Sequence, residues 1–161
     1  MLRFTAGDIL KAEQHYIAQG VATGRQEGLG TGLALKISKR WPEVQVAFKK
    51  HTRSRTFGGG DIFVVPRSED RPGVVYLATQ PDMYHATMGY LRRAARRLAG
   101  WAEEKHIASV ALPKIGAGLG KLSWEGEVKP LLTEYLDSGR TEFVVYEVFR
   151  NSMEAAETNS E

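Results

Sequence analysis

The stretch VALPKIGAGLGKLSWEGEVKPLL, residues 110–132, holds in one segment the features that decide the fold. Its apolar start is typical of a buried strand, three alternate glycines then indicate a bare turn, and a helical segment follows Ser123. A strand that leads through a turn into a helix is the repeating unit of α/β folds. This stretch therefore predicts a sheet covered by helices, with a glycine-rich loop at a strand end.

The same alternation continues on both sides of this stretch. Strands are predicted at residues 2–7, 15–24, 61–67, 73–80, 108–115 and 141–149, and helices at 31–41, 43–51, 84–105 and after 123. Strands that alternate with helices form mostly parallel sheets. We therefore expect a three-layer α/β sandwich, with a mixed, mostly parallel sheet and helices on both faces. Residues 1–150 are predicted to form a single domain and residues 151–161 a polar C-terminal tail.

Composition limits the class of protein. The chain has 161 residues, of which 42% are hydrophobic and 25% charged, as in an ordinary globular domain. The absence of cysteine excludes disulfides, thiolate zinc sites and a cysteine nucleophile, and it favours a cytoplasmic location. No segment approaches the roughly 20 apolar residues of a membrane span. We expect a monomer with no membrane partner.

Positive charge is concentrated in two zones of the sequence. Residues 36–55 carry seven Lys or Arg against the single acid Glu43, and a second group comprises Arg92, Arg93, Arg96 and Arg97. Such zones suggest an anionic partner, and nucleic acid is one alternative. Solvated helix faces are the other.

Two glycine-rich loops follow predicted strands, GRQEGLGTG at residues 24–32 and GAGLGKL at residues 116–122. Ligands bind beyond the carboxyl ends of parallel strands, so both loops should face one cleft. A dinucleotide fingerprint fails in every register, and a Walker A loop fails because Leu122 follows Gly120 and Lys121. Bare loops can still turn their amides toward an anion such as a diphosphate. The alternative is that the glycines only close tight turns.

Single polar residues near the expected cleft are the candidates for catalysis, namely Gln19, Thr79, Gln80 and His85. For His85 the alternative is a surface position in the first turn of a helix. Gln80 has no titratable group, so it cannot be a general base. The four histidines are too far apart in the sequence for a local metal motif, and we expect no metal site. Trp124 is expected in the core.

The order of motifs resembles a macrodomain. The resemblance covers residues 3–149 and is carried by FTAGDIL, GLGTGLALKISKRWP, VVYLATQ, VALPKIGAGLGKLSWEGEVKPLLTEYL and FVVYEVF. It is similar to the branch that contains the terminal ADP-ribose protein glycohydrolase, the DarG-type antitoxin that removes ADP-ribose from DNA, and the yeast-type ADP-ribose-1''-phosphate phosphatase. This resemblance implies binding of ADP-ribose or an ADP-ribosylated macromolecule, without a cofactor.

The resemblance also implies which residues bind the ligand. Asp8 with Ile9 corresponds to the pair that binds adenine, although Asp8 could instead cap a helix. The two glycine loops correspond to those that wrap the diphosphate and the distal ribose through backbone amides. A large residue at Gly118 should block the ligand most severely. The implied ligand-binding set is Asp8, Ile9, Gly28, Leu29, Gly30, Thr31, Gly32, Gly116, Ala117, Gly118, Leu119 and Gly120.

Two positions depart from the catalytic pattern of this branch. Gln80 stands where the glycohydrolases have a lysine that attacks the distal ribose, and Gly120 stands where the protein glycohydrolase has an acid. Lys114 or Lys121 could serve only by turning inward. Three hypotheses follow: a hydrolase of an ADP-ribosyl group or of ADP-ribose-1''-phosphate, an ADP-ribose reader without chemistry, and a basic nucleic-acid-binding α/β module.

Overall fold

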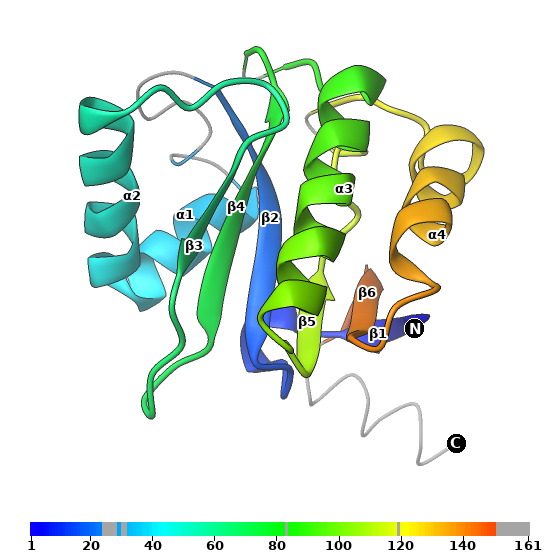
Figure 1. Ribbon diagram of the computed structural model, residues 1–161, viewed down its shortest axis with the longest axis horizontal. Coiled ribbons are helices and arrows are strands. Elements are labelled where there is room, and N and C mark those ends of the chain that lie inside the picture. Colours follow the sequence, from blue (N-terminus) through cyan, green and yellow to red (C-terminus); the bar gives the residue numbers. More distant parts are fainter. Residues whose placement is uncertain (24–28, 30–31, 83, 119, 151–161) are drawn as a thin grey trace.

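The computed structural model describes residues 1–23, 29, 32–82, 84–118 and 120–150 (Figure 1). The strands are β1 (Leu2–Gly7), β2 (Tyr16–Ala22), β3 (Ile62–Val65), β4 (Gly73–Gln80), β5 (Ser109–Leu112) and β6 (Glu142–Phe149). The helices are α1 (Gly32–Arg40), α2 (Pro42–Ser54), α3 (Met88–Glu104) and α4 (Lys129–Leu136). A 3₁₀ turn, η1 (Ile9–Lys11), and a π-helical turn, η2 (Trp124–Val128), complete the elements. Every predicted strand and helix is present.

The strands form one six-stranded sheet in the order β1-β6-β5-β2-β4-β3. All neighbouring pairs are parallel except β3 and β4, which form an antiparallel hairpin at one edge. The mixed, mostly parallel sheet is therefore confirmed. Because β2, β4, β5 and β6 run in the same direction, their carboxyl ends meet along one edge of the sheet, where α/β proteins bind ligands.

Helices cover both faces of this sheet, α1 and α2 on one side and α3 and α4 on the other (Figure 1). Strand β4 shows why, since its residues are buried on both faces. Val75 and Leu77 belong to the core under α3 and α4, whereas Val74 and Tyr76 belong to the core under α1 and α2. Successive side chains of a strand point to opposite faces. A strand of β-branched and aromatic residues thus supports two cores, and the three-layer prediction is confirmed.

The start of α3 differs from the prediction. The helix begins at Met88, four residues after the expected Tyr84, with Thr87 as N-cap; the Thr87 hydroxyl accepts from Tyr90 N at 3.1 Å. Before it, the Asp82 carboxylate accepts from the backbone N–H groups of Tyr84 and His85 at 2.7 and 2.9 Å. An aspartate that binds nearby backbone amides competes with helix formation. His85 therefore lies in the turn before the helix rather than in its first turn.

Smaller differences concern α2 and Trp124. Helix α2 extends to Ser54, beyond the predicted end at His51, and Pro42 occupies its first turn, where a missing N–H costs nothing. Trp124 is half-buried, and its ring contacts Phe4 edge-on with centroids 6.4 Å apart. Within the described ranges, no helix is both long and apolar enough to cross a bilayer. The expected tail, residues 151–161, lies outside the described residues.

Candidate functional site

Two adjoining hollows open at the carboxyl ends of the central strands. The Gln19 hollow, of about 200 Å³, is lined by Gln19, Gly20, Val21, Ala22, Gly32, Leu33, Ala34, Gln80, Pro113, Lys114, Ile115, Gly116 and Gly118. The Asp8 hollow, also about 200 Å³, is lined by Gly7, Asp8, Ile9, Leu10, Gly32, Leu33, Lys36, Pro113, Tyr146 and Phe149. Because both include Gly32, Leu33 and Pro113, they form one groove that passes the first turn of α1.

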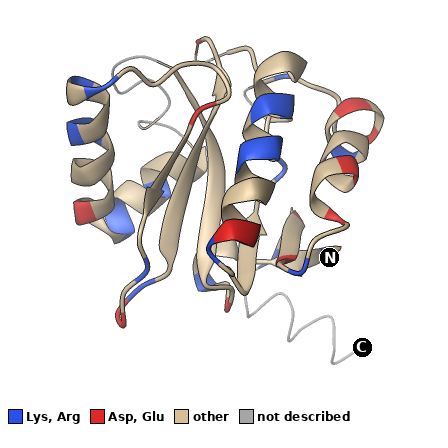
Figure 2. Cartoon of the chain, viewed as in Figure 1, with Lys and Arg blue, Asp and Glu red and all other residues tan. Residues whose placement is uncertain are grey.

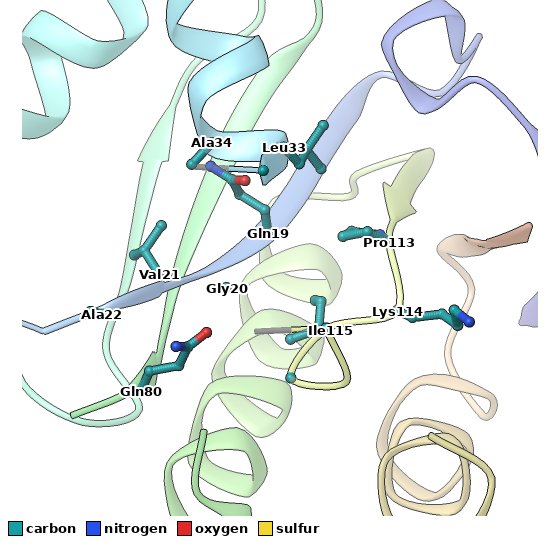
Figure 3. A pocket seen from close by; sticks show the side chains of 13 residues that line it. Gln19, Gly20, Val21, Ala22, Leu33, Ala34, Gln80, Pro113, Lys114 and Ile115 are labelled. Atoms are coloured by element: carbon teal, nitrogen blue, oxygen red, sulfur yellow. The ribbon is translucent and has the colours of Figure 1, made fainter. Parts of the chain in front are cut away.

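Gln19 gives the first hollow its polar character. It lies on β2 with 2% exposure, and its amide nitrogen finds no hydrogen-bond acceptor in the described part of the chain. Figure 3 shows its side chain directed toward the start of α1, beside Leu33 and Ala34. Leaving a buried donor unpaired costs about 1–3 kcal/mol. A polar ligand group in the hollow would provide the missing partner.

Gln80 lies at the opposite rim of the Gln19 hollow (Figure 3). Its amide nitrogen donates to the Asp82 carbonyl at 2.9 Å, which fixes the side chain at the end of β4. Thr79, the preceding residue on β4, is fully buried. Its hydroxyl lies so close to Gly20 of the neighbouring strand β2 that a Cβ added to Gly20 would approach it to 2.4 Å. Gln80 thus lines the hollow, whereas Thr79 packs against β2 and does not line it.

The turn after Gln80 carries a histidine paired with an aspartate. His85 Nδ1 lies 3.2 Å from Asp82 Oδ1, and the His85 side chain is 64% exposed. The backbone N–H of Tyr84, together with the contacts from His85, lowers the pKa of the Asp82 carboxyl. The turn is joined to the second glycine loop because Ala86 N donates to the Gly120 carbonyl at 2.9 Å. His85 therefore lies beside the groove and is absent from its lining.

The three alternate glycines of the second loop have different structural reasons. Gly116 adopts φ +77°, a conformation that favours glycine. A Cβ on Gly120 would lie 2.7 Å from the Gly116 carbonyl oxygen and 2.8 Å from Ala86 Cβ, so packing excludes it. A Cβ on Gly118 would meet no atom of the described residues within 4 Å. The fold thus accounts for two of the glycines, while Gly118 lies in the lining of the Gln19 hollow with no such constraint.

The Asp8 hollow combines apolar walls with three polar side chains, those of Asp8, Lys36 and Tyr146. The Asp8 carboxylate accepts from Leu10 N at 3.0 Å and so caps the short turn η1, while Ile9 is buried. The two interpretations of Asp8 are therefore compatible, since it caps a turn and lines the hollow. Tyr146 donates its hydroxyl to Gln14 Oε1 at 2.8 Å, and burial raises the pKa of its phenol. Phe149, at the end of β6, is exposed to the hollow's mouth.

Comparison with known proteins agrees with this architecture. Residues 8–129 match the family model of the Macro domain. The chain belongs to the Macro domain family. A DNA ADP-ribosyl glycohydrolase of Thermus aquaticus is 31% identical over 155 residues, which are 94% of this chain and 42% of that relative. The chain thus spans less than half the length of this curated relative.

Two further relatives bear on the macrodomain. The solved macrodomain of Thermus aquaticus DarG superimposes with a TM-score of 0.82 at 30% identity, covering 91% of this chain and 98% of that one. The ADP-ribose glycohydrolase OARD1 of Bos taurus is 25% identical over 119 residues, 73% of each chain. The likeness to the solved macrodomain covers nearly all of both chains.

The macrodomain groove gathers part of the predicted ligand-binding set. Its lining includes Asp8, Ile9, Gly32, Gly116 and Gly118. Ala117 and Gly120 line neither hollow, and Leu29 is a core residue under α1 with 2% exposure. The predictions for Gly28, Gly30, Thr31 and Leu119 lie outside the described residues.

The predicted catalytic candidates of the macrodomain are only partly brought together. Gln19 and Gln80 line the same hollow, whereas Thr79 and His85 do not. Figure 3 shows Lys114 pointing away from both glutamines, and Lys121 is exposed and lines neither hollow. The described residues contain no cluster of three or more His, Asp or Glu that could hold a metal. The polar side chains that face the Gln19 hollow are therefore neutral amides.

Sequence reasoning missed several residues that line the macrodomain groove, namely Leu33, Lys36, Pro113, Tyr146 and Phe149. Tyr146 and Phe149 belong to the last strand, whose carboxyl end meets the same sheet edge as the other strands. The rule that ligands bind beyond those ends, applied to every strand, would have included them.

Proposed function

We propose that the groove binds ADP-ribose, with adenosine in the Asp8 hollow and the distal ribose in the Gln19 hollow. The observation that carries this proposal is that the two hollows meet at Gly32 and Leu33, the first turn of α1. A helix N-terminus presents free amides and a positive field to an anion. A ligand with two nucleoside-sized ends and a diphosphate between them fits this arrangement.

The chemistry of the two ends supports this orientation. The Asp8 carboxylate can accept from the exocyclic amine of adenine, and Ile9 and Phe149 provide apolar surface beside it. At the other end, the unpaired amide of Gln19 can donate to a ribose hydroxyl. Hydrogen bonds that satisfy a group already buried add affinity without a further desolvation cost.

We further propose that the chain hydrolyses a bond at the anomeric carbon of the distal ribose. Both curated relatives named above are glycohydrolases, which supports this class of reaction. Water would attack that carbon, the bond to the leaving group would break, and a proton would pass from the water to the leaving group. Gln19 and Gln80 can orient the water, and the imidazole of His85 can carry the proton.

A second candidate function is an ADP-ribose reader without chemistry. Gln80 favours it, because this amide stands where the resembling glycohydrolases have a lysine and can neither attack nor accept a proton. The reader and the hydrolase share the same groove. They differ only in whether bound substrate is turned over.

Calorimetric titration with ADP-ribose tests the binding proposal, and no heat at millimolar ligand would contradict it. Turnover is then measured on ADP-ribosylated DNA, ADP-ribosylated protein and ADP-ribose-1''-phosphate. We expect release from at least one of them. We also expect His85→Gln to slow it about 100-fold, the lower end of the range for general acid–base catalysis, because the imidazole lies beside the groove and not in its lining. Binding without turnover of any substrate would establish the reader.

Gln80→Lys sharpens the same experiment. This change restores the lysine of the resembling glycohydrolases at the rim of the Gln19 hollow, and Gln80→Met, of similar length and without charge, is its matched control. A gain of turnover in the lysine variant alone would show that the hollow holds the distal ribose in a reactive position. Equal rates in both variants would remove Gln80 from the reaction.

A further inference from the structure

Positive charge gathers around one edge of the sheet. Figure 2 shows Lys and Arg on the upper turns of α2 and on the upper half of α3, with one acidic segment between them. In the sequence, Asp61 is the one acid in residues 44–61 and 88–102. We call this the basic surface, and it comprises Lys50, Arg53, Arg55, Arg93, Arg96 and Arg97, all exposed.

The loop of residues 55–61 follows α2 in the chain and also contacts α3, although the two helices cover opposite faces of the sheet. Residues 55–61 lead from α2 around the edge strand β3 and reach α3. Arg93 Nη1 donates to the Gly59 carbonyl at 3.3 Å, and Arg97 forms an ion pair with Asp61. The loop lies so close that a Cβ on Gly59 would meet the Tyr90 ring at 2.3 Å. The loop that follows α2 is thus held against α3 by two of its arginines.

The same loop brings the basic surface to the groove. Gly60 N donates to the Ala78 carbonyl and Ala78 N donates to the Asp61 carbonyl, each at 2.8 Å. Ala78 precedes Gln80 by two residues on β4, and Gln80 lines the Gln19 hollow. On the side of α4 the exposed charges are mixed, with Glu125 and Glu127 beside Lys121. A long anion that reaches the Gln19 hollow therefore meets the larger excess of positive charge on the β3 side.

Most of the cations on this surface are not neutralised by neighbours. Among the described residues, Lys50, Arg53, Arg55 and Arg96 have no ion-pair partner. Arg92 differs, since it donates to Tyr135 Oη at 3.0 Å and lies 3.6 Å from Glu134, so it faces α4 and is not part of the surface. Several exposed cations without ion-pair partners on one surface can bind the phosphates of a strand.

We propose that the basic surface binds the phosphate backbone of a nucleic-acid strand and leads that strand to the Gln19 hollow. Arginine and lysine contacts to phosphates supply affinity without reading the base sequence. The binding itself stands on charge and position alone. That the strand carries ADP-ribose into the hollow rests on the proposed function.

The test uses fluorescence anisotropy with a single-stranded 20-mer DNA that carries no ADP-ribose. We expect binding that weakens with salt, and we expect Lys50→Gln with Arg53→Gln to weaken it about 10-fold and to lower the salt slope by about 1.5. The matched control is Lys105→Gln with Arg140→Gln. It removes the same charge at the opposite end of α3, and we expect it to change affinity less than about 2-fold, the effect of net charge alone.

Three results would overturn the inference. They are no binding at 50 mM salt, equal losses in the two double variants, or equally tight binding of a polyglutamate of the same charge, which would indicate an acidic protein as the partner. Titration of the same preparations with ADP-ribose separates this inference from the proposed function. ADP-ribose binding without DNA binding leaves the groove assignment intact, and DNA binding without ADP-ribose binding leaves only the surface.

Discussion

The two hollows of the groove have equal volumes and a shared wall, yet their chemistry is opposite. The Asp8 hollow includes a carboxylate, an amine and a phenol from Asp8, Lys36 and Tyr146. The Gln19 hollow presents neutral amides, since the one titratable side chain in its described lining, Lys114, points away. The titratable groups of the lining thus lie at the end that would hold adenosine, whereas the end that would hold the reacting ribose is lined by amides, and the proposed proton carrier, His85, lies beside the groove. Recognition and chemistry occupy different hollows.

Gly118→Glu is expected to have the largest effect on ADP-ribose affinity, and it tests whether the Gln19 hollow holds the ligand at all. A Cβ added at Gly118 meets no atom of the described residues within 4 Å, so the fold should tolerate the change, but a carboxylate would enter the Gln19 hollow. We expect ADP-ribose affinity to fall at least about 100-fold, or about 2.7 kcal/mol. Calorimetry measures the loss, and circular dichroism checks the fold. Unchanged affinity would show that the ligand lies elsewhere.

Gly120→Ala is the counterpart, with an effect on stability. Its Cβ would lie 2.7 Å from the Gly116 carbonyl oxygen and 2.8 Å from Ala86 Cβ. Overpacking of this kind costs about 1–3 kcal/mol of unfolding free energy. Urea unfolding measures it, with Gly118→Ala as the control that should change little. Equal stability of both variants would mean that the loop yields without strain.

Asp8→Asn tests the recognition end. Asparagine keeps the cap on Leu10 N, so the turn η1 should persist, but the charge of the acceptor is lost. We expect ADP-ribose to bind about 10-fold more weakly. The inosine analogue, which has a carbonyl in place of the adenine amine, should gain relative to ADP-ribose in this variant. A variant that keeps the wild-type preference for adenine would assign the base to another site.

Gln19→Leu gives the smallest expected effect and sharpens the contrast between the hollows. It removes a buried amide that lacks an acceptor in the described structure, so the free protein should be as stable as wild type or more stable by up to about 1 kcal/mol. ADP-ribose should bind about 5-fold more weakly, and ADP, which lacks the distal ribose, should be unaffected. Parallel thermal unfolding and calorimetry give both quantities. An equal loss for the two ligands would place Gln19 near the diphosphate instead.

The fold was predictable because its determinants are local. The β-branched run of β4 and the apolar stripe of α3 each predict their element without knowledge of the neighbours. The start of α3 was not, because the side chain of Asp82 competes for the backbone amides of Tyr84 and His85, and the sequence alone did not show which of these interactions would prevail. Periodicity places elements better than it places their ends.

The site was predictable where it depends on the backbone and less so where it depends on side-chain direction. Gly116 and Gly118 follow a strand end and line the groove as expected, and Gln19 and Gln80 meet across it. Sequence spacing did not show that Gly120 is required by Ala86, a residue more than thirty positions away. Tyr146 reaches the groove from the last strand, which sheet order brings beside β1 and β5. Such contacts depend on tertiary structure.

The hydrogen bond from Ala86 N to the Gly120 carbonyl has a consequence for observing the groove in solution. Neither residue lines a hollow, yet the bond ties the turn that follows Gln80 to the second glycine loop. Amide exchange at a bonded N–H requires the local structure to open. A ligand that holds the second glycine loop in place should therefore slow deuterium uptake at the Ala86 amide. This amide would then report occupancy of the groove without touching the ligand.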